Sequence, residues 1–416
     1  MKSFFDFLHQ LNQYLRTPFI PTWTPQVGAL LLVMAMAVFL LNGNFWSVFA
    51  GIRYLGDAFN NWLGLGPLLD LDDHLLPPLK HRSLISDIAM VMGAMGAAML
   101  AGQFRLSRPA PMEYVTAMLG GCFMGMGASL AGGCTVGGFF NPLVFSSPAG
   151  WMMLLGLMIG AALAIRAMIW AKKVLPWGGT PEPQCTTPLW QVRFTWLGWV
   201  PILGGMAWGV SWITQAGTDS TLAKRGFIVI TALFLGVVLQ RSRLCFAQAI
   251  REPFETGGGE YAKALMLAIL LVTPLAALLI TRLNIDPYSI IPPRFWWGSF
   301  FGGILFGVGM ILGQGCAASS LWRLGEGNLK MLVSLFFFAW SGSISFAWLR
   351  IQGWLELDVD LDYLDGVPTV SDLGYQAFLP DLLDSWGLAL TLTLGIIIIW
   401  FLLIEYNEKH KTFTRF

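Results

Sequence analysis

One glycine-rich pattern occurs twice in this chain, at residues 120–134 and again at residues 302–316. Both copies read GGxxxGxGxxLxxGC, and every matched position is displaced by the same 182 residues (316 − 134 = 182). A shared register of this kind indicates an internal duplication. The pattern therefore predicts two related halves, each with a glycine-lined helix that ends at a cysteine, Cys134 or Cys316.

Apolar residues dominate the sequence around both copies. Of the 416 residues, 56% are hydrophobic and only 12% are charged, and the mean hydropathy is +0.64. We predict an all-α polytopic membrane protein with about 9–10 transmembrane helices, because apolar runs long enough to cross a hydrocarbon core recur along the chain. Several runs are short, which is typical of broken or re-entrant helices. The runs lie at 27–42, 84–103, 113–133, 149–171, 194–212, 226–241, 263–282, 298–315, 329–349 and 387–404.

The duplication and the apolar runs together predict a domain organisation. Residues 1–26 lack the apolar core and small-residue cleavage site of a signal peptide, so we interpret them as an amphipathic cytoplasmic segment. We expect the first transmembrane repeat at 27–212 and the second at 226–404, joined by a linker at 213–225. Residues 405–416 are expected to form a cytoplasmic tail.

Loop charges predict the orientation, because cytoplasmic loops are enriched in lysine and arginine. A cytoplasmic N-terminus places most basic loop residues inside and the acidic clusters at 70–73 and 358–365 outside, with Lys224 and Arg225 as exceptions. Five runs per half is an odd number, so the second half should be inverted. Inverted repeats with interrupted helices are typical of transporters and channels, and the permeation site lies between the repeats. The residues assigned to the inside are Arg105, Arg108, Lys172, Lys173, Arg241, Arg243, Arg251, Lys263, Lys409, Lys411 and Arg415.

Two interpretations of the repeated glycines are open. Glycine pairs at GxxxG spacing, 121/125 and 303/307, allow transmembrane helices to pack closely. Packing alone does not explain why both copies end in Gly-Cys. Glycine followed by small polar residues also suits a helix that breaks inside the membrane and directs its free backbone N–H groups at an anion.

The chain contains five cysteines, of which only Cys185 lies in a polar loop. A buried cysteine in a membrane protein usually acts as a small apolar side chain. Cys122 has only this interpretation, because Ile304 replaces it in the second copy. Cys134 and Cys316 differ, because the duplication places them at equivalent positions on the two faces of one site.

A further cysteine, Cys245, follows the basic stretch Arg241-Ser242-Arg243. Basic neighbours can activate a thiol or attract an anion, although an ordinary cytoplasmic loop would also be basic. The stretch 245–251 weakly matches 47–53, and the match places Ser47 opposite Cys245. Arg323 and Glu326 likewise allow two interpretations, a simple cytoplasmic turn or an ion pair that shapes the mouth of the site.

Several other classes of function are not supported. The sequence contains no CxxC motif and no Cys/His cluster for zinc or iron–sulfur, and no P-loop for ATP-driven transport. The 25 basic and 24 acidic residues nearly cancel, so nothing suggests nucleic-acid binding. In the acidic stretch 358–369, Tyr363 stands where a calcium loop requires glycine and Thr369 where it requires glutamate, so we interpret it as a solvated loop. No cofactor is expected.

The two Gly-Cys helices, together with the stretch 236–246 that reads GVVLQRSRLCF, resemble the YeeE/YedE family of prokaryotic sulfur-transport membrane proteins. The length and the acidic loops are similar to the YedE-type branch. The resemblance implies uptake of thiosulfate, or a related sulfur or selenium compound, across the bacterial inner membrane along an hourglass-shaped path lined by thiols. It also implies a TusA-like cytosolic sulfur carrier as partner, besides membrane lipid. The residues expected along the substrate path are Cys134, Cys316, Cys245, Gly133, Gly315, Thr135, Gln314, Ser319 and Gln248.

Three hypotheses follow from these observations. The favoured one is a transporter, not an enzyme, that passes a thiosulfate-like anion along cysteine thiols and backbone N–H groups of broken helices. The second is a membrane sulfur-transfer protein that carries a persulfide on Cys245. The third is a channel for a small neutral solute in which the cysteines only pack. Alanine at Cys134 and Cys316 separates the first from the third, and labelling of Cys245 from the cytoplasm tests the second.

Overall fold

Helices occupy all ten predicted apolar runs in the computed structural model, which describes residues 17–71, 77–174, 195–217, 220–283, 285–358, 367–371 and 373–414. Among these residues, eight helical stretches are long and apolar enough to cross a membrane, and α2 is apolar but shorter. The predicted all-α membrane fold is therefore confirmed. The long helices are α2 (Pro25–Leu41), α4 (Arg82–Leu100), α5 (Pro111–Ala131), α7 (Ala149–Val174), α8 (Trp199–Gln215), α9 (Ser220–Ser242), α11 (Glu260–Leu283), α12 (Trp297–Gly313), α14 (Leu329–Ile351) and α16 (Trp386–His410).

Four of the long helices break and continue as short helical segments, as the sequence predicted. α3 (Phe49–Trp62) follows α2, and α10 (Phe246–Glu255) follows α9. A π-helical segment, η3 (Thr135–Phe140), and α6 (Asn141–Val144) follow α5, while α13 (Ala317–Gly325) follows α12. The remaining helical segments are short: η1 (Thr17–Phe19), η2 (Pro78–Lys80), η4 (Thr195–Gly198), η5 (Pro287–Ser289), α15 (Leu379–Leu382) and η6 (Thr412–Thr414).

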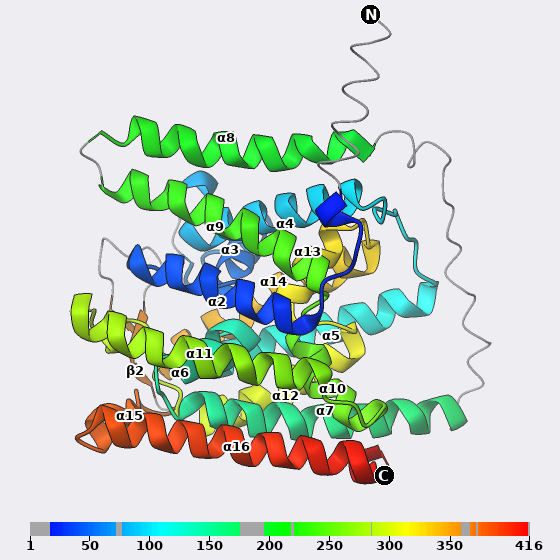
Figure 1. Ribbon diagram of the computed structural model, residues 1–416, viewed down its shortest axis with the longest axis vertical. Coiled ribbons are helices and arrows are strands. Elements are labelled where there is room, and N and C mark those ends of the chain that lie inside the picture. The colour runs from blue at the N-terminus through cyan, green and yellow to red at the C-terminus, as the bar shows by residue number, and fades with distance from the viewer. Residues whose placement is uncertain are drawn as a thin grey trace, which may run out of the picture.

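The two glycine-lined helices, α5 and α12, pack against each other as an antiparallel pair inside the bundle (Figure 1). A Cβ atom added to Gly127 would lie 2.5 Å from the backbone nitrogen of Phe306. One added to Gly309 would lie 2.5 Å from the backbone nitrogen of Met124. Both pairs are related by the displacement of the sequence repeat (309 − 127 = 306 − 124 = 182). Backbones this close leave no room for side chains, so the packing interpretation is correct for these glycines.

The surrounding helices repeat the same arrangement. α12 packs on α7 as α5 packs on α14, and α4 packs on α9 as α11 packs on α2. Short segments follow the rule as well, because α3 contacts α14 as α10 contacts α7. In Figure 1, α8 and α16 lie along opposite edges of the bundle. This exchange of equivalent helices, with α5 antiparallel to α12, is consistent with inverted repeats.

The predicted domain boundaries cut into some of these helices. α8 ends at Gln215 and α9 begins at Ser220, so the helices extend into the expected linker at 213–225. The expected tail at 405–416 includes the last turns of α16, whose polar residues had marked it as non-membrane. Of the N-terminal segment 1–26, residues 1–16 lie outside the described residues.

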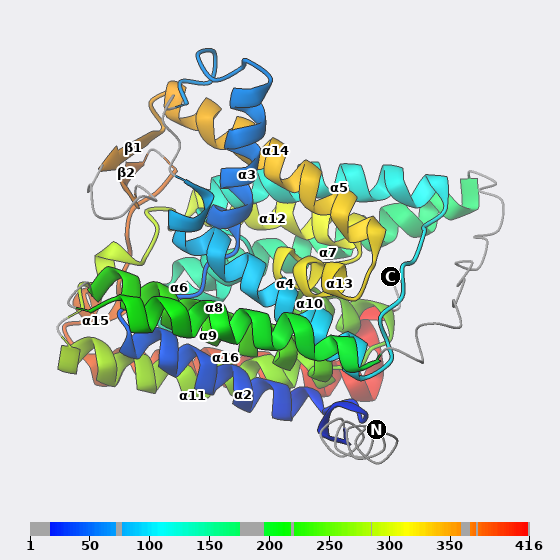
Figure 2. The same ribbon diagram turned by 90° about the horizontal axis from the view of Figure 1, so that it is seen from above.

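A two-stranded hairpin interrupts the helical fold. β1 (Leu355–Asp358) pairs antiparallel with β2 (Val367–Ser371), at the end of the bundle opposite the C-terminus of α16 (Figure 2). Buried Leu355 joins Leu349 and Leu373 in a small separate core. We had predicted only a solvated loop here, because strands of four and five residues are too short to show an alternating pattern. Other acidic loop residues and Cys185 lie outside the described residues.

Candidate functional site

The two Gly-Cys breaks share one backbone geometry. The C-cap residues are Gly132 after α5 and Gln314 after α12. Both adopt the left-handed conformation, with φ of 74° and 61°. The following N–H groups, of Gly133 and Gly315, donate to the carbonyls of Ala128 and Met310 at 2.8 and 3.0 Å. These glycine N–H groups therefore close the preceding helices and do not point at a ligand, contrary to one expectation from the sequence.

The cysteine that follows each break is the N-cap of the next helical segment. Cys134 and Cys316 have extended backbones, with ψ of −168° and 173°. Their carbonyls accept equivalent hydrogen bonds from Gly138, at 2.7 Å, and Ser320, at 2.8 Å. An N-cap side chain usually supplies oxygen to free backbone N–H groups. Here sulfur takes that position in both halves.

In the second half, two thiols and a hydroxyl form one cluster. The Cys316 sulfur accepts from the backbone of Ser319 at 3.5 Å, and the Ser319 hydroxyl accepts from the backbone of Cys316 at 2.8 Å. Cys245 is the N-cap of α10, and its thiol lies close to Cys316, Ser319 and the backbone of Gln248. The structure thus brings together four of the predicted site residues, which come from two different broken helices.

In the first half, a single thiol faces two helix N-termini. The Cys134 sulfur lies close to the backbone groups of Val136 and Gly137, in η3, and of Phe49, the first residue of α3. Asn141 ties the same segments together by donating from its side chain to the Trp46 carbonyl at 2.7 Å. No second cysteine lies at this position. The ion pairs Arg53–Asp57 in α3 and Arg251–Glu255 in α10 share the displacement that sets Ser47 opposite Cys245 (251 − 53 = 245 − 47 = 198).

The other predicted residues lie around these clusters. The hydroxyl of Thr135 is buried beside Cys134 and has no hydrogen-bond partner among the described residues. Gly133 and Gly315 are required by packing, because an added Cβ would lie 2.7 Å from the Gly137 backbone and 2.9 Å from the Ser319 hydroxyl, respectively. The side chain of Gln314 is exposed, so this residue contributes its backbone conformation and not a ligand to the thiol cluster.

A cavity of about 420 Å³ leads to Cys245. We call it the vestibule; it is lined by Arg243, Cys245, Gln248, Tyr261, Trp322, Arg323, Glu326 and Asn328. Arg243 forms an ion pair with Glu326 at 2.8 Å, whereas Arg323 donates to the Gln314 carbonyl at 2.6 Å. The suggested pairing of Arg323 with Glu326 is therefore wrong, because Arg243 occupies the carboxylate. Cys245 itself is only 3% exposed, so it lies at the inner end of the vestibule.

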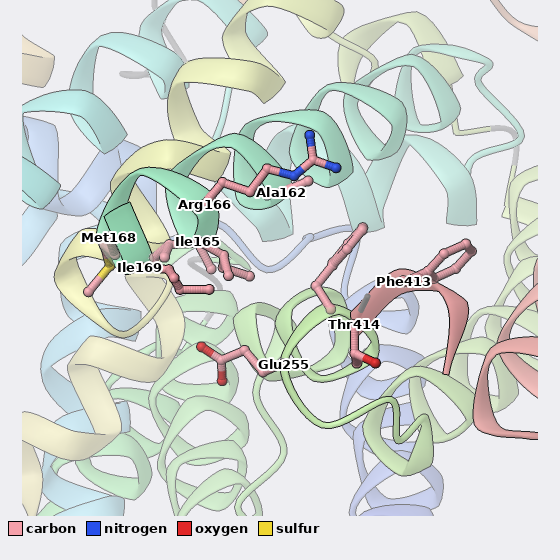
Figure 3. Close-up of a pocket in the computed structure, with 10 residues that line it drawn as sticks. Ala162, Ile165, Arg166, Met168, Ile169, Glu255, Phe413 and Thr414 are labelled. Atoms are coloured by element: carbon pink, nitrogen blue, oxygen red, sulfur yellow. The ribbon is translucent and has the colours of Figure 1, made fainter. Parts of the chain in front are cut away.

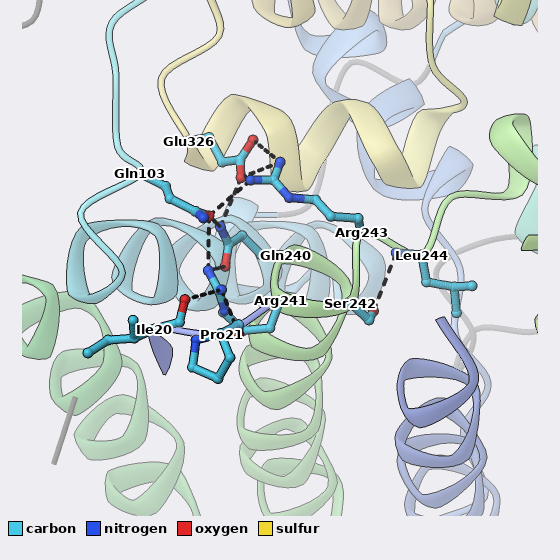
Figure 4. A network of polar contacts seen from close by, with 9 residues as sticks. All are labelled: Ile20, Pro21, Gln103, Gln240, Arg241, Ser242, Arg243, Leu244 and Glu326. Carbon is cyan, nitrogen blue, oxygen red and sulfur yellow. Dashed lines mark hydrogen bonds and ion pairs between the residues drawn. The ribbon is translucent and has the colours of Figure 1, made fainter. Parts of the chain in front are cut away.

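A polar network holds one wall of the vestibule (Figure 4). The side-chain oxygen of Gln103 accepts from Arg241 and from Arg243, both at 3.0 Å. Gln240 donates to Glu326 at 2.8 Å, and the fully buried Arg241 donates to the Pro21 carbonyl at 2.9 Å. These contacts tie the end of α9 to α13 and to the residues before α2. They also fix Arg243 in a left-handed conformation (φ 57°) that few non-glycine residues adopt.

Two charged residues near Cys134 were missed by the sequence analysis. Asp87 in α4 is buried, acts electrostatically on Cys134, and lies so close to Gly51 that an added Cβ would collide with its carboxylate. A single acidic residue inside an apolar run is itself an indication of function. The sequence analysis considered only chains of several acidic or histidine residues, of the kind that proton pumps contain. Arg294 is fully buried against Gly132, and burial lowers its pKa to about 9, so it stays charged at pH 7. Its position in a loop gave no sequence signal.

Two further hollows contain none of the predicted path residues. A groove of about 290 Å³ lies between α7, the end of α10 and η6, and its lining includes Arg166, Glu255, Phe413 and Thr414 (Figure 3). An apolar crevice of about 370 Å³ lies between α3, α4 and α14 and includes Asp87. No group of three or more histidine, cysteine or acidic residues among the described residues could hold a metal ion.

Comparison with known proteins identifies the family of this chain. A sequence model of the family described as Sulphur transport matches residues 9–163 and 241–415. The chain is 24% identical over 340 residues to "Probable transporter YedE" of Escherichia coli K12, covering 76% of this chain and 79% of that protein. It is 28% identical over 170 residues to "Thiosulfate transporter TsuA" of Spirochaeta thermophila, covering 37% of this chain and 49% of that protein. These relatives are named as transporters. The three cysteines at the helix breaks, Cys134, Cys245 and Cys316, all lie within the residues that the family model matches.

Proposed function

The chain belongs to the sulphur-transport family, and from this premise we propose that it carries thiosulfate, or a closely related sulfur or selenium oxyanion, across the membrane between its two sets of broken helices. The observation that carries this proposal is the occupation of N-cap positions by sulfur in both halves. Cys134 faces the N-termini of η3 and α3, and Cys245 and Cys316 cap α10 and α13. The relative named as a thiosulfate transporter supports the choice of anion.

The chemistry of the anion fits these positions. Thiosulfate is a dianion whose charge is shared between its three oxygens and its soft terminal sulfur. Positive helix ends can offset the charge. The terminal sulfur of the anion can accept a hydrogen bond from a cysteine S–H and so take the place of a contact between two thiols. Each S–H contact contributes roughly 1 kcal/mol or less. Weak contacts in series favour release as much as binding, which is what permeation requires.

We infer that the vestibule faces the cytoplasm of a bacterial inner membrane. Basic residues gather at that end of the bundle, including Arg105, whose backbone N–H donates to the Glu326 carbonyl, and Arg251 in α10. By the positive-inside rule this end is cytoplasmic, which places both chain termini inside. A TusA-like sulfur carrier would then receive the anion's sulfur at the vestibule.

Uptake of radiolabelled thiosulfate into proteoliposomes tests the proposal. We expect uptake by the wild type and its loss in Cys134→Ala and in Cys316→Ala, with selenite and sulfate as competitors to identify the preferred anion. Cys122→Ala is the matched control, because Cys122 lies on α5 away from the break and only its backbone carbonyl accepts a hydrogen bond, from Ser341. Normal uptake in both site variants would instead support a channel in which the cysteines only pack.

A further inference from the structure

The vestibule combines features that packing does not explain. It has a volume of about 420 Å³ and places two guanidinium groups, one carboxylate and a thiol around one space. A cavity of this size is far larger than one water molecule needs. Polar side chains line it from the link between α9 and α10, from α10, α11 and α13, and from the start of α14, so five segments contribute to one polar surface.

The charges in the vestibule do not cancel. Glu326 pairs with Arg243 at 2.8 Å, and their side chains are 15% and 35% exposed, so this pair is partly desolvated and largely neutral as a unit. Arg323 donates to a neutral carbonyl, that of Gln314. Within the residues that the structure describes, no carboxylate forms an ion pair with Arg323. One positive charge is therefore left over.

Trp322 positions this extra charge. Its side chain is 1% exposed, and its ring lies 5.3 Å from the Arg243 guanidinium carbon and 5.2 Å from that of Arg323. A buried ring with a guanidinium near it restrains the direction of that group. The charge of Arg323 reaches the Cys245 thiol electrostatically. The positive group and the thiol therefore act on the same space.

We propose that the vestibule is an anion-binding site in which Arg323 supplies the uncompensated charge, the Arg243–Glu326 ion pair forms the opposite wall, and Cys245 contacts the bound anion from the inner end. Gln248, Tyr261 and Asn328 add neutral hydrogen-bond donors. The side-chain oxygen of Asn328 already caps α14 by accepting from Lys330 at 3.1 Å, which leaves its amide N–H groups for a ligand. The ligand class is a small sulfur oxyanion, an identity that rests on the proposed function.

Charged thiol reagents test the site without any transport. We would measure the rates at which an anionic and a cationic methanethiosulfonate modify Cys245 in the purified protein, using peptide mass spectrometry and a free thiol as reference. The anionic reagent should be favoured in the wild type. Removing one unit charge in Arg323→Gln changes the local concentration of each reagent by about threefold in opposite directions, so the rate ratio should fall about tenfold. Glu326→Gln should raise the ratio.

Three controls keep the result interpretable. Arg323→Lys keeps the charge and should keep the ratio near the wild-type value, which separates charge from folding. Arg282→Gln makes the same change at the far end of α11, the helix that carries Tyr261 near its start, and should leave the ratio unchanged. Thiosulfate should slow modification of Cys245 in the wild type, and about tenfold more of it should be needed in Arg323→Gln.

Two results would contradict the proposed anion site. An unchanged rate ratio in Arg323→Gln, or no modification of Cys245 in the folded wild type, would overturn the vestibule site. Failure of the proposed function looks different. If thiosulfate is not transported while the rate ratio still depends on Arg323, the site stands and the anion is another one. If uptake depends on the cysteines while the ratio does not respond, only the vestibule site is lost.

Discussion

The two halves of this protein share a backbone but surround their cysteines differently. Gly132 and Gln314 adopt the same left-handed conformation, and both are contacted by an arginine, Arg294 in the first case and Arg323 in the second. Beyond the break the halves diverge. Cys316 meets a second thiol, Cys245, at the end of a charged vestibule, whereas Cys134 meets backbone groups and, electrostatically, the carboxylate of Asp87.

The comparison distinguishes the features that both halves share from those that differ between them. The glycine seam and the N-cap geometry are properties of the backbone, and they must be kept in both halves for the helices to pack and to break. The side chains around each thiol can change freely. In the proposed inverted arrangement one of these sites would lie toward each face, and the different surroundings would give the two ends of the proposed path different affinities for an anion.

The largest effect is expected at the shared backbone. Gly127→Ala and Gly309→Ala each place a methyl group 2.5 Å from a backbone nitrogen of the facing helix, so α5 and α12 must separate. We expect each substitution to destabilise the protein by about 2–3 kcal/mol, with similar decreases in the thermal unfolding temperature measured in detergent. Gly395→Ala is the control, because nothing lies within 4 Å of that position. Unequal effects at the two seam positions would break the equivalence of the halves.

The paired thiols should distinguish the halves next. A trivalent arsenical such as phenylarsine oxide forms two As–S bonds with neighbouring thiols and releases water. We expect one adduct on the wild type by intact mass spectrometry, and loss of thiosulfate uptake that a small dithiol restores. Cys134→Ala should still form the adduct, while Cys316→Ala and Cys245→Ala should not. An adduct that requires Cys134 would show that the path brings the thiols together differently.

The duplicated helices and their breaks could be predicted from the sequence because both depend on local patterns. Apolar runs mark the spans, and Gly-Cys marks the ends of α5 and α12. The pairing of Cys245 with Cys316 could not be predicted in the same way. It requires α10 and α13, from segments about 70 residues apart (316 − 245 = 71), to start at the same place, and only the packing of the second half determines that.

The vestibule shows the same limit at the level of side chains. The basic stretch before Cys245 was visible in the sequence, and so was the possibility that Arg323 and Glu326 shape the mouth of the site. Which arginine holds the carboxylate depends on Gln103, which comes from the end of α4 and orients Arg243 at 3.0 Å. No pattern in the sequence connects these residues, so the pairing of Glu326 with Arg243 could not be predicted, and Arg323 was the only partner that the sequence suggested.

Asp87 provides a smaller test of the difference between the halves. A carboxylate beside Cys134 should oppose a passing dianion, so Asp87→Asn is expected to lower the KM for thiosulfate by about three- to tenfold. Asp57→Asn is the control, because Asp57 lies on the neighbouring α3 and pairs with Arg53 at 3.6 Å. If Asp87→Asn instead abolishes uptake as Cys134→Ala should, the carboxylate takes part in transport, for example by binding a co-transported cation.

The smallest effect is expected outside the membrane, at the end of the bundle opposite the vestibule. There the Tyr288 hydroxyl donates to Asp381 at 2.7 Å, and this hydrogen bond raises the pKa of Tyr288 to about 12. A raised folded-state pKa means that the contribution to stability is complete below the unfolded value of about 10 and is lost as pH rises toward 12. Since the bond is exposed, Tyr288→Phe should lower the stability by about 1 kcal/mol or less.

Thermal unfolding of the wild type and Tyr288→Phe at pH 8 and above pH 11 measures this contribution. The unfolding temperatures of the two proteins should differ slightly at pH 8 and converge at high pH. A difference that persists would mean that Tyr288 acts through packing against Phe378.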